Sequence, residues 1–345
     1  RQQRVAMMYP EKSKILSLLE KGIAVPVCVP VGYHFDPVKL FCRIRHLGYG
    51  FLFESSMNGK LNSRYSFAGA GPSSVIKLKK NECQKDPLVL LRQELFSVPV
   101  YHDACLPPFT GGLAGYVGYG ASSYFDDICL YAHNDLELPD LYFAHFDTIF
   151  VYDHFLEKCS IVSMAFPAVS PRADLRKALG KIDFYTALVK RNVPASCVPR
   201  LRSGTTVPLR KRGRIGGKTI VRPGMTAGKV ERMVRAAKKY IKAGDIYQAN
   251  LSQRFSLKMP GVGITGLYRN LRTINPSCFG GLLDFDGVGI VSSSPERLVS
   301  LCGCIAQTRP IAGTVARGKD RIEDAVFKRR LLVSPKQRAE HLMLV

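Results

Sequence analysis

Two polar motifs set in strand-like sequence contain the residues best suited to chemistry in this chain. The first runs from Gly244 to Phe255 and reads GDIYQANLSQRF, and the second runs from Thr308 to Thr314 and reads TRPIAGT. Both alternate apolar and polar side chains, as a half-buried strand does. Their polar positions hold small or hydrogen-bonding groups, such as the amide of Gln248. The pattern predicts a cleft that binds a polar ligand.

The elements that must position these motifs form a block that starts near Met225. Thr226 is a suitable N-cap for an amphipathic helix, and Gly244 is a suitable stop for it. A polar strand is expected over 246–255. After it, the periodicity predicts helices at 267–274, 321–332 and from 335 onward, and strands at 282–285, 288–293, 298–302 and 304–308.

A second block covers residues 1–165 and alternates apolar strands with short helices. Its expected helices lie at 12–22 and 87–94, and its expected strands at 23–30, 50–56, 64–69, 146–152 and 159–164. Between them, residues 109–119 alternate glycine with aromatic side chains, which indicates a strand that another backbone approaches closely. That segment lacks the Lys-Ser/Thr ending of a phosphate-binding loop and the helix that follows a dinucleotide-binding loop.

The stretch between the two blocks, 166–224, is rich in basic residues and reads as a linker, although 175–189 has the pattern of a helix. Residues 171–229 hold 15 Lys or Arg against 2 Asp, a surplus of 13 out of the chain's net +23. Apart from the adjacent Phe184 and Tyr185, no aromatic residue is interleaved with the basic ones for base stacking. A solvated basic linker is the simplest interpretation, and a nonspecific contact with an anionic partner is the alternative.

Composition excludes several classes of protein. The chain is 46% hydrophobic and 345 residues long, enough for about two domains. It has no apolar run of about 18 residues and no signal-peptide pattern, so we expect no membrane association. Its ten cysteines include no C-x-x-C pair, which favours reduced, buried thiols in a cytoplasmic protein. Cys302 and Cys304 are expected to pack within a sheet.

Four motifs resemble the chorismate-binding enzymes, and in particular the large subunit of anthranilate synthase. They are AGDIYQANLSQRF, SSSPERL, TRPIAGT and SPKQRAEHLMLV, in the order in which that family has them. The resemblance covers nearly all of 1–165 and 225–345. It implies an α+β sandwich of mostly antiparallel sheets with flanking helices, and a catalytic domain that begins at residue 225.

The resemblance implies roles for individual residues. Glu340 matches a glutamate that coordinates Mg²⁺, which holds the substrate carboxylate. Glu296 matches the acid near the departing C4 hydroxyl of chorismate. Ala312, Gly313 and Thr314 match residues that line the bound substrate.

Two positions bear on which reaction the resemblance implies. Relatives that add water to chorismate have a lysine base where this chain has Gln248, and ammonia needs no such base. Many aminodeoxychorismate synthases have a nucleophilic lysine where this chain has Ala312. Both positions favour direct amination to anthranilate. Because the chain shows no glutaminase motif, ammonia from glutamine would need a separate amidotransferase subunit.

Glu54 and Ser55 resemble the family's tryptophan-feedback segment, whose usual partner is matched here by Asn275 and Pro276. Half of that partner segment differs, so feedback by tryptophan is an open question. Gln337, one helical turn before Glu340, stands where the family often has a second acid. The weaker charge there predicts weaker metal binding.

The sequence starts without Met and stops at Val345, inside a family motif, so we read it as partial. The family continues with further catalytic and Mg²⁺-binding residues. We therefore expect residues 1–345 alone to bind Mg²⁺-chorismate poorly and to show little or no turnover. Two alternatives to anthranilate formation stay open: an aminodeoxychorismate synthase, and a noncatalytic remnant whose basic stretch contacts nucleic acid.

Overall fold

The computed structural model describes residues 8–32, 36–55, 64–79, 86–128, 134–190, 221–259 and 262–344. The chain divides into two compact units, one made of residues 1–198 and 264–345 and the other of residues 199–263. The domain boundaries expected from the sequence, at 165 and 225, stay predictions. Among the described helices, none is long and apolar enough to cross a bilayer.

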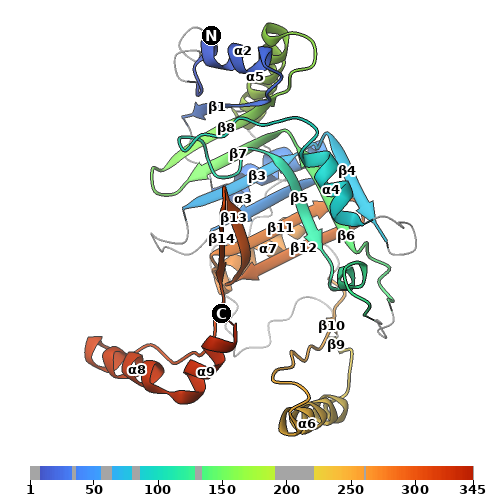
Figure 1. The fold of residues 1–345 in the computed structure, drawn as a ribbon, viewed down its shortest axis with the longest axis vertical. Helices are drawn as coiled ribbons and strands as arrows, with labels where there is room; N and C mark the ends of the chain where they lie inside the picture. Colours follow the sequence, from blue (N-terminus) through green and yellow to red (C-terminus); the bar gives the residue numbers. More distant parts are fainter. Residues whose placement is uncertain are drawn as a thin grey trace. The chain divides into compact units, whose positions relative to one another are not determined.

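A seven-stranded antiparallel sheet is the centre of the larger unit (Figure 1). It joins strands from both ends of the sequence, because β2 pairs with β11 in a register that sets Leu52 beside Leu282. In spatial order the strands are β1 (Val25–Val31), β8 (Lys158–Ala165), β7 (Thr148–Asp153), β3 (Tyr65–Ala70), β2 (Gly50–Glu54), β11 (Phe279–Phe285) and β12 (Val288–Ser294).

A second antiparallel sheet packs against one face of the first. It consists of β4 (Ser74–Leu78), β6 (Leu141–Phe146) and β5 (Gly112–Val117), with β6 in the middle. Phe51 and Val151 from the large sheet share an apolar cluster with Tyr142 and Phe146 from the small one. The expected α+β sandwich of antiparallel sheets is therefore confirmed.

Helices cover the opposite face of the large sheet. Leu52 and Phe150 point into a cluster that includes Phe41 and Ile182 from two of these helices. The helices are α2 (Lys12–Glu20), α3 (Pro37–Ile44), α5 (Pro171–Lys190) and α7 (Ile264–Ile274). The helix expected at 175–189 is thus present as α5, and it buries one apolar face rather than lying in solvent.

In the described part of the chain, the remaining helices and strands bury few side chains. In the larger unit they are α4 (Pro87–Leu95), the short 3₁₀ helices η1 (Arg45–Leu47) and η2 (Tyr119–Tyr124), the hairpin β13 (Arg297–Cys302) and β14 (Ile305–Arg309), α8 (Arg321–Val333) and α9 (Pro335–Leu344). The smaller unit holds β9 (Arg222–Pro223), α6 (Ala227–Ala243) and β10 (Phe255–Ser256). Thr226 caps α6 and Gly244 ends it at φ 83°, as expected.

The strand expected over 246–255 is wrong for most of its length. Only Phe255 and Ser256 form a strand, which pairs with Arg222 and Pro223. Alternation of apolar and polar residues indicates which face a strand would bury, but a strand also needs a neighbour for its backbone hydrogen bonds. Residues 246–254 belong to no strand pairing in the described part of the unit, although the carbonyl oxygen of Arg254 accepts a hydrogen bond of 2.7 Å from the backbone N–H of Gly224.

The expectation that the cysteines are buried is only partly correct. Cys42 and Cys159 are buried, and burial raises the pKa of Cys159 to about 12. Cys105, Cys302 and Cys304 are exposed instead. Cys302 ends β13 and Cys304 belongs to the turn after it, so the two thiols lie at the tip of a hairpin rather than within a packed sheet.

Gly115 should be the least replaceable residue of β5. A Cβ atom there would lie 2.0 Å from the carbonyl oxygen of Tyr142, which confirms the close backbone approach expected for 109–119. We predict that Gly115→Ala lowers the free energy of unfolding by about 2–3 kcal/mol, because β6 must move away. Chemical denaturation measures this change.

Gly180→Ala is the matched control for that experiment. Gly180 lies within α5, where an added Cβ would meet nothing within 4 Å. Alanine should stabilise the helix there by roughly 0.5–1 kcal/mol. Equal effects at the two glycines would contradict the packing described for β5.

Candidate functional site

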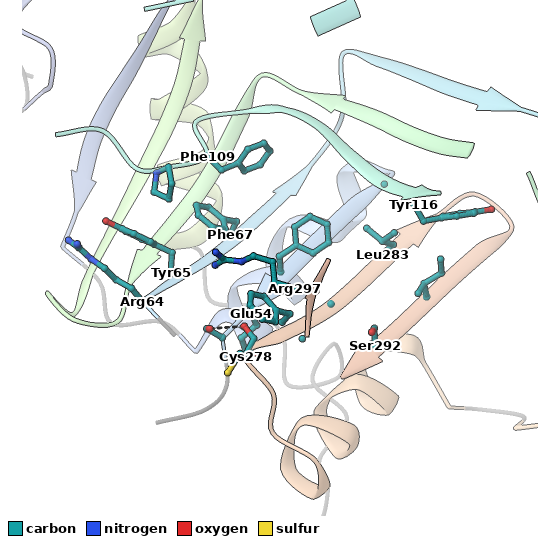
Figure 2. Close-up of a pocket in the computed structure, with 18 of the residues that line it drawn as sticks. Glu54, Arg64, Tyr65, Phe67, Phe109, Tyr116, Cys278, Leu283, Ser292 and Arg297 are labelled. Atoms are coloured by element: carbon teal, nitrogen blue, oxygen red, sulfur yellow. Dashed lines mark hydrogen bonds between the residues drawn. The ribbon is translucent and has the colours of Figure 1, made fainter. Parts of the chain in front are cut away.

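A cavity of about 650 Å³ opens beside the large sheet of the larger unit (Figure 2). Strands β2, β3, β5, β11 and β12 contribute to its wall, and β13 and β14 each add an arginine. Its lining is rich in aromatic rings: Phe53, Tyr65, Phe67, Phe109, Tyr116 and Phe279. The size and apolar character suit an organic molecule with a planar ring.

Glu54, at the end of β2, is the most deeply buried charged group of this wall. Only 3% of its surface is exposed. Its Oε1 lies 2.5 Å from Nη2 of Arg272, and its Oε2 accepts a hydrogen bond of 3.0 Å from the hydroxyl of Tyr268. Arg272 also donates to Oδ2 of Asp36 at 2.9 Å. These four side chains tie β2 to α7 and to the start of α3.

The guanidinium of Arg272 pairs with two acids, Glu54 and Asp36, and affects the pKa of each. Burial raises the pKa of Glu54, and the attraction of Arg272 only partly offsets that effect. Burial would also raise the pKa of Asp36, but there Arg272 and two backbone N–H groups more than reverse it, so its pKa is lowered. Burial raises the pKa of Tyr268 as well, which keeps its proton available for Glu54.

Ser55, next to Glu54, links the end of β2 to the start of β11. Its hydroxyl donates to the carbonyl oxygen of Cys278 at 2.8 Å, shown as the dashed line in Figure 2. Its backbone N–H donates to Oγ of Ser66 at 3.3 Å, and that oxygen lies 2.7 Å from Nε2 of His154. Burial lowers the pKa of His154, so the neutral ring is favoured.

Three arginines line the cavity in different settings. Arg64 binds Asp153 through two nitrogens, at 3.0 and 2.9 Å. Arg297 lies over the ring of Phe279, 5.4 Å from its centroid, and its Nη1 is 3.4 Å from Oε1 of Gln307. Arg309, at the end of β14, is the third arginine of the cavity lining.

The structure gathers part of the expected catalytic set at the base of the hairpin. Glu296 lies exposed between β12 and β13, and its Oε1 accepts a hydrogen bond of 2.9 Å from the backbone N–H of Ile311. Gly313, at φ 69°, packs so tightly that an added Cβ would lie 2.3 Å from Oε1 of Gln337 on α9. The loop that carries TRPIAGT is therefore held by Glu296 on one side and faces Gln337 on the other.

The other expected site residues lie in varied places. Ala312 is half-buried and Thr314 is exposed within the same loop. Asn275 and Pro276 are exposed just before β11, close in sequence to the Cys278 carbonyl that binds Ser55. Gln248 is exposed and belongs to the smaller unit.

Gln337 and Glu340 lie about one turn apart on α9, and both carry side-chain oxygens of the kind that a hard cation binds. Oε1 of Gln337 is buried and has no hydrogen-bond partner, and Glu340 follows one helical turn later. Lys336 Nζ is 3.8 Å from the Glu340 carboxylate, a weak, exposed pair. Mg²⁺ commonly takes one or two protein carboxylates and completes its shell with water and substrate. No group of three His, Cys, Asp or Glu gathers as a metal site in the described part of the chain.

Sequence reasoning missed the residues that neutralise Glu54. A signal was available, because Tyr268 and Arg272 are four residues apart and so share one face of α7. Nothing in the sequence, however, indicated that this face meets β2, more than two hundred positions away.

Comparisons with known proteins agree on one family. The model of the family described as chorismate binding enzyme matches residues 50–345. The chain is 31% identical over 322 residues to anthranilate synthase component 1 of Aquifex aeolicus, covering 90% of this chain and 63% of that protein. It is also 31% identical over 305 residues to aminodeoxychorismate synthase component 1 of Bacillus subtilis, covering 85% of this chain and 60% of that protein.

A solved structure supports the same relationship. The anthranilate synthase component I of Streptococcus pneumoniae superimposes with a TM-score of 0.64 at 28% identity, over 83% of this chain and 61% of that one. The chain therefore spans a little under two thirds of the length of these relatives.

The buried ion pair generates a stability prediction. Arg272→Met should lower the free energy of unfolding by about 3–5 kcal/mol, because the Glu54 carboxylate would stay buried without a cation. Chemical denaturation of the variant measures the loss. The double variant Glu54→Gln, Arg272→Met should recover part of it. A double variant no more stable than Arg272→Met alone would show that the pair is not the cause.

His154 generates a pH prediction. Its folded pKa lies below the ordinary 6.5, so below that pH the unfolded chain binds a proton that the folded chain does not. The free energy of unfolding should therefore fall as the pH drops below about 6.5. In His154→Gln that slope should be shallower. The exposed His46→Gln is the control, and the same slope in both variants would contradict the assignment.

Proposed function

Because the chain belongs to the family of chorismate binding enzymes, we propose that it carries the amination chemistry of an anthranilate synthase large subunit. The reaction would convert chorismate and ammonia to anthranilate, pyruvate and water. The match of the family model to residues 50–345 is the observation that carries the proposal. The contact of Glu296 with the TRPIAGT loop supports it, because it joins two motifs expected to share one site.

In this proposal the loop from Ala312 to Thr314 binds the substrate ring, and Glu296 supplies the acid for the departing hydroxyl. The hydrogen bond from Ile311 to Oε1 of Glu296 orients the carboxyl group. A carboxyl group held through one oxygen can present the other to a ligand. The acid must be protonated when the hydroxyl leaves, so its surroundings in the complex must favour the neutral form.

Glu340 and Gln337 would hold Mg²⁺ through oxygen atoms of α9. When bound, the ion would fix the substrate carboxylate and draw electron density from the ring. The neutral amide of Gln337 offers less charge than a second carboxylate, so Glu340 should dominate the affinity. The unpartnered oxygen of Gln337 supports its place in this set.

Two residues, Gln248 and Ala312, favour direct attack by ammonia on the substrate. Gln248 cannot act as a base for water, and Ala312 cannot act as a nucleophile toward the ring. Ammonia is itself nucleophilic and needs neither. We propose that a separate glutamine amidotransferase subunit supplies it in the cytoplasm.

Aminodeoxychorismate formation is the second candidate. The 31% identity to the Bacillus subtilis aminodeoxychorismate synthase equals that to the Aquifex relative, so overall similarity does not separate the two products. Ala312 favours anthranilate, because it cannot form the covalent adduct that a lysine would.

Product identity tests the proposal. We expect the purified chain, given chorismate, Mg²⁺ and ammonium, to bind chorismate weakly and to turn it over slowly at most, in keeping with the expectation from the sequence. Any product it forms should be fluorescent, have the mass of anthranilate and appear together with pyruvate. An aminated product that retains its enolpyruvyl group would favour the second candidate instead. Calorimetry in the same buffer measures chorismate binding apart from turnover, and absence of both binding and product would contradict both candidates.

Glu340→Gln should weaken Mg²⁺-dependent chorismate binding about tenfold or more, because a charged contact of this kind contributes about 1.5–3 kcal/mol. Titration of Mg²⁺ at fixed chorismate measures the change. Glu231→Gln on α6 is the matched control, since Glu231 also pairs with a cation one turn along its own helix. Equal effects in both variants would remove Glu340 from the metal site.

A further inference from the structure

Two thiols lie at the tip of the hairpin that β13 and β14 form, in the sequence Cys302-Gly303-Cys304. The two strands make a sheet of their own, and their pairing ends where Cys302 lies opposite Ile305. Gly303 and Cys304 are therefore the two residues of the turn. Both cysteines are exposed and neither is part of a disulfide. The hairpin thus presents two free thiols to solvent.

The turn keeps these two cysteines close together. Gly303 has φ 57°, and glycine at the first position of a two-residue hairpin loop is typical of a type II′ turn. Because only one residue separates the cysteines, their Cα atoms are at most about 7.6 Å apart, twice the spacing of about 3.8 Å along the chain. An ion bound to two sulfur atoms at about 2.3 Å each holds them at most about 4.6 Å apart. Two cysteine side chains can span that geometry while the strands stay paired.

The donor set decides which kind of ion could bind at this tip. No third His, Cys, Asp or Glu forms a metal-binding group with the two thiols among the described residues. A structural zinc site uses four ligands, and Mg²⁺ prefers oxygen atoms. Two thiolates without oxygen or nitrogen donors suit a soft monovalent ion, which accepts two-coordinate binding by sulfur.

We propose that Cys302 and Cys304 together bind a soft monovalent cation such as Cu⁺. Each thiol loses its proton when its sulfur binds the metal. One Cu⁺ and two neutral thiols therefore give a bis-thiolate complex of charge −1 and two protons. The metal keeps its oxidation state, so the step needs no oxidant or reductant.

This site is separate from the residues proposed for amination. The register of the hairpin places Arg297 opposite Arg309 at one end and Cys302 opposite Ile305 at the other. Glu296 directly precedes Arg297, so it lies at the base of the hairpin while the thiols lie at the tip. The thiols can therefore be changed without touching Glu296 or the loop that it holds.

Competition with a coloured chelator tests the proposal. The reduced chain is added, without oxygen, to the coloured complex of Cu⁺ with bicinchoninate, and loss of colour measures the Cu⁺ transferred to the protein. We expect the chain to take up about one equivalent of Cu⁺ tightly, and an excess of Mg²⁺ to leave that uptake unchanged. A complex that keeps its colour, or uptake that Mg²⁺ prevents, would overturn the proposal.

Serine variants then locate the ion. Cys302→Ser and Cys304→Ser should each weaken Cu⁺ binding about a hundredfold or more, since loss of a residue that only supports a metal ligand already costs about 10–100-fold. The double variant should bind no more weakly than either single one, because each sulfur alone is a poor site. The other thiols of the chain contribute equally to all three variants and to the unchanged chain.

Cys105→Ser is the matched control, because Cys105 is also an exposed free thiol and lies outside the hairpin. It should leave the Cu⁺ affinity unchanged. Thermal unfolding of each metal-free variant checks that it is folded. An affinity that survives in Cys302→Ser or in Cys304→Ser, or that falls as far in Cys105→Ser, would overturn the proposal.

The inference does not depend on the proposed function. The Cu⁺ titration contains no chorismate, and the turnover assay contains no Cu⁺. Loss of Cu⁺ binding with intact amination would reject the dithiol site alone. Absence of chorismate binding with intact Cu⁺ binding would reject the amination chemistry alone.

Discussion

The pairing of β2 with β11, closed by the buried contact of Glu54 with Arg272, is the constraint on which the larger unit depends. It joins residues 50–54 to residues 279–285 in one sheet and fixes α7 and α3 at the edge of the cavity. A charge buried this deeply is costly unless its partner is in place. The contact therefore specifies one arrangement of the two segments. In any other arrangement the Glu54 carboxylate would be exposed to solvent or buried without the guanidinium of Arg272.

The hairpin and the loop that follows it are held in a different way. Residues of β13, β14, α8 and α9 bury little, so hydrophobic packing contributes less there than in the sandwich. The local geometry is fixed instead by the hydrogen bond between Glu296 and the Ile311 backbone and by the close packing of Gly313 against Gln337. The proposed catalytic residues thus lie on the least packed part of the larger unit. The aromatic cavity is lined mainly by strands of the two packed sheets, with one arginine each from β13 and β14. This difference suits a site whose substrate and metal must still enter.

Much of the fold could be predicted from local patterns. Periodicity located α2, α5, α6 and most strands to within a few residues, because amphipathic order and caps such as Thr226 and Gly244 act locally. The strand expected at 246–255 did not form, since pairing depends on a neighbour that the pattern cannot name. The burial of Cys302 was misjudged for a related reason, as a turn at Gly303 places it at a hairpin tip. Arg272 and Arg297 acquire their importance only through contacts between distant segments.

A crystal structure of the chain with Mg²⁺ and chorismate would test the account most directly. The account predicts the cyclohexadiene ring against Gly313 and Thr314, with Glu296 near its C4 hydroxyl and the metal ion on Glu340. Chorismate found instead in the aromatic cavity against Arg297, with no metal on α9, would contradict it.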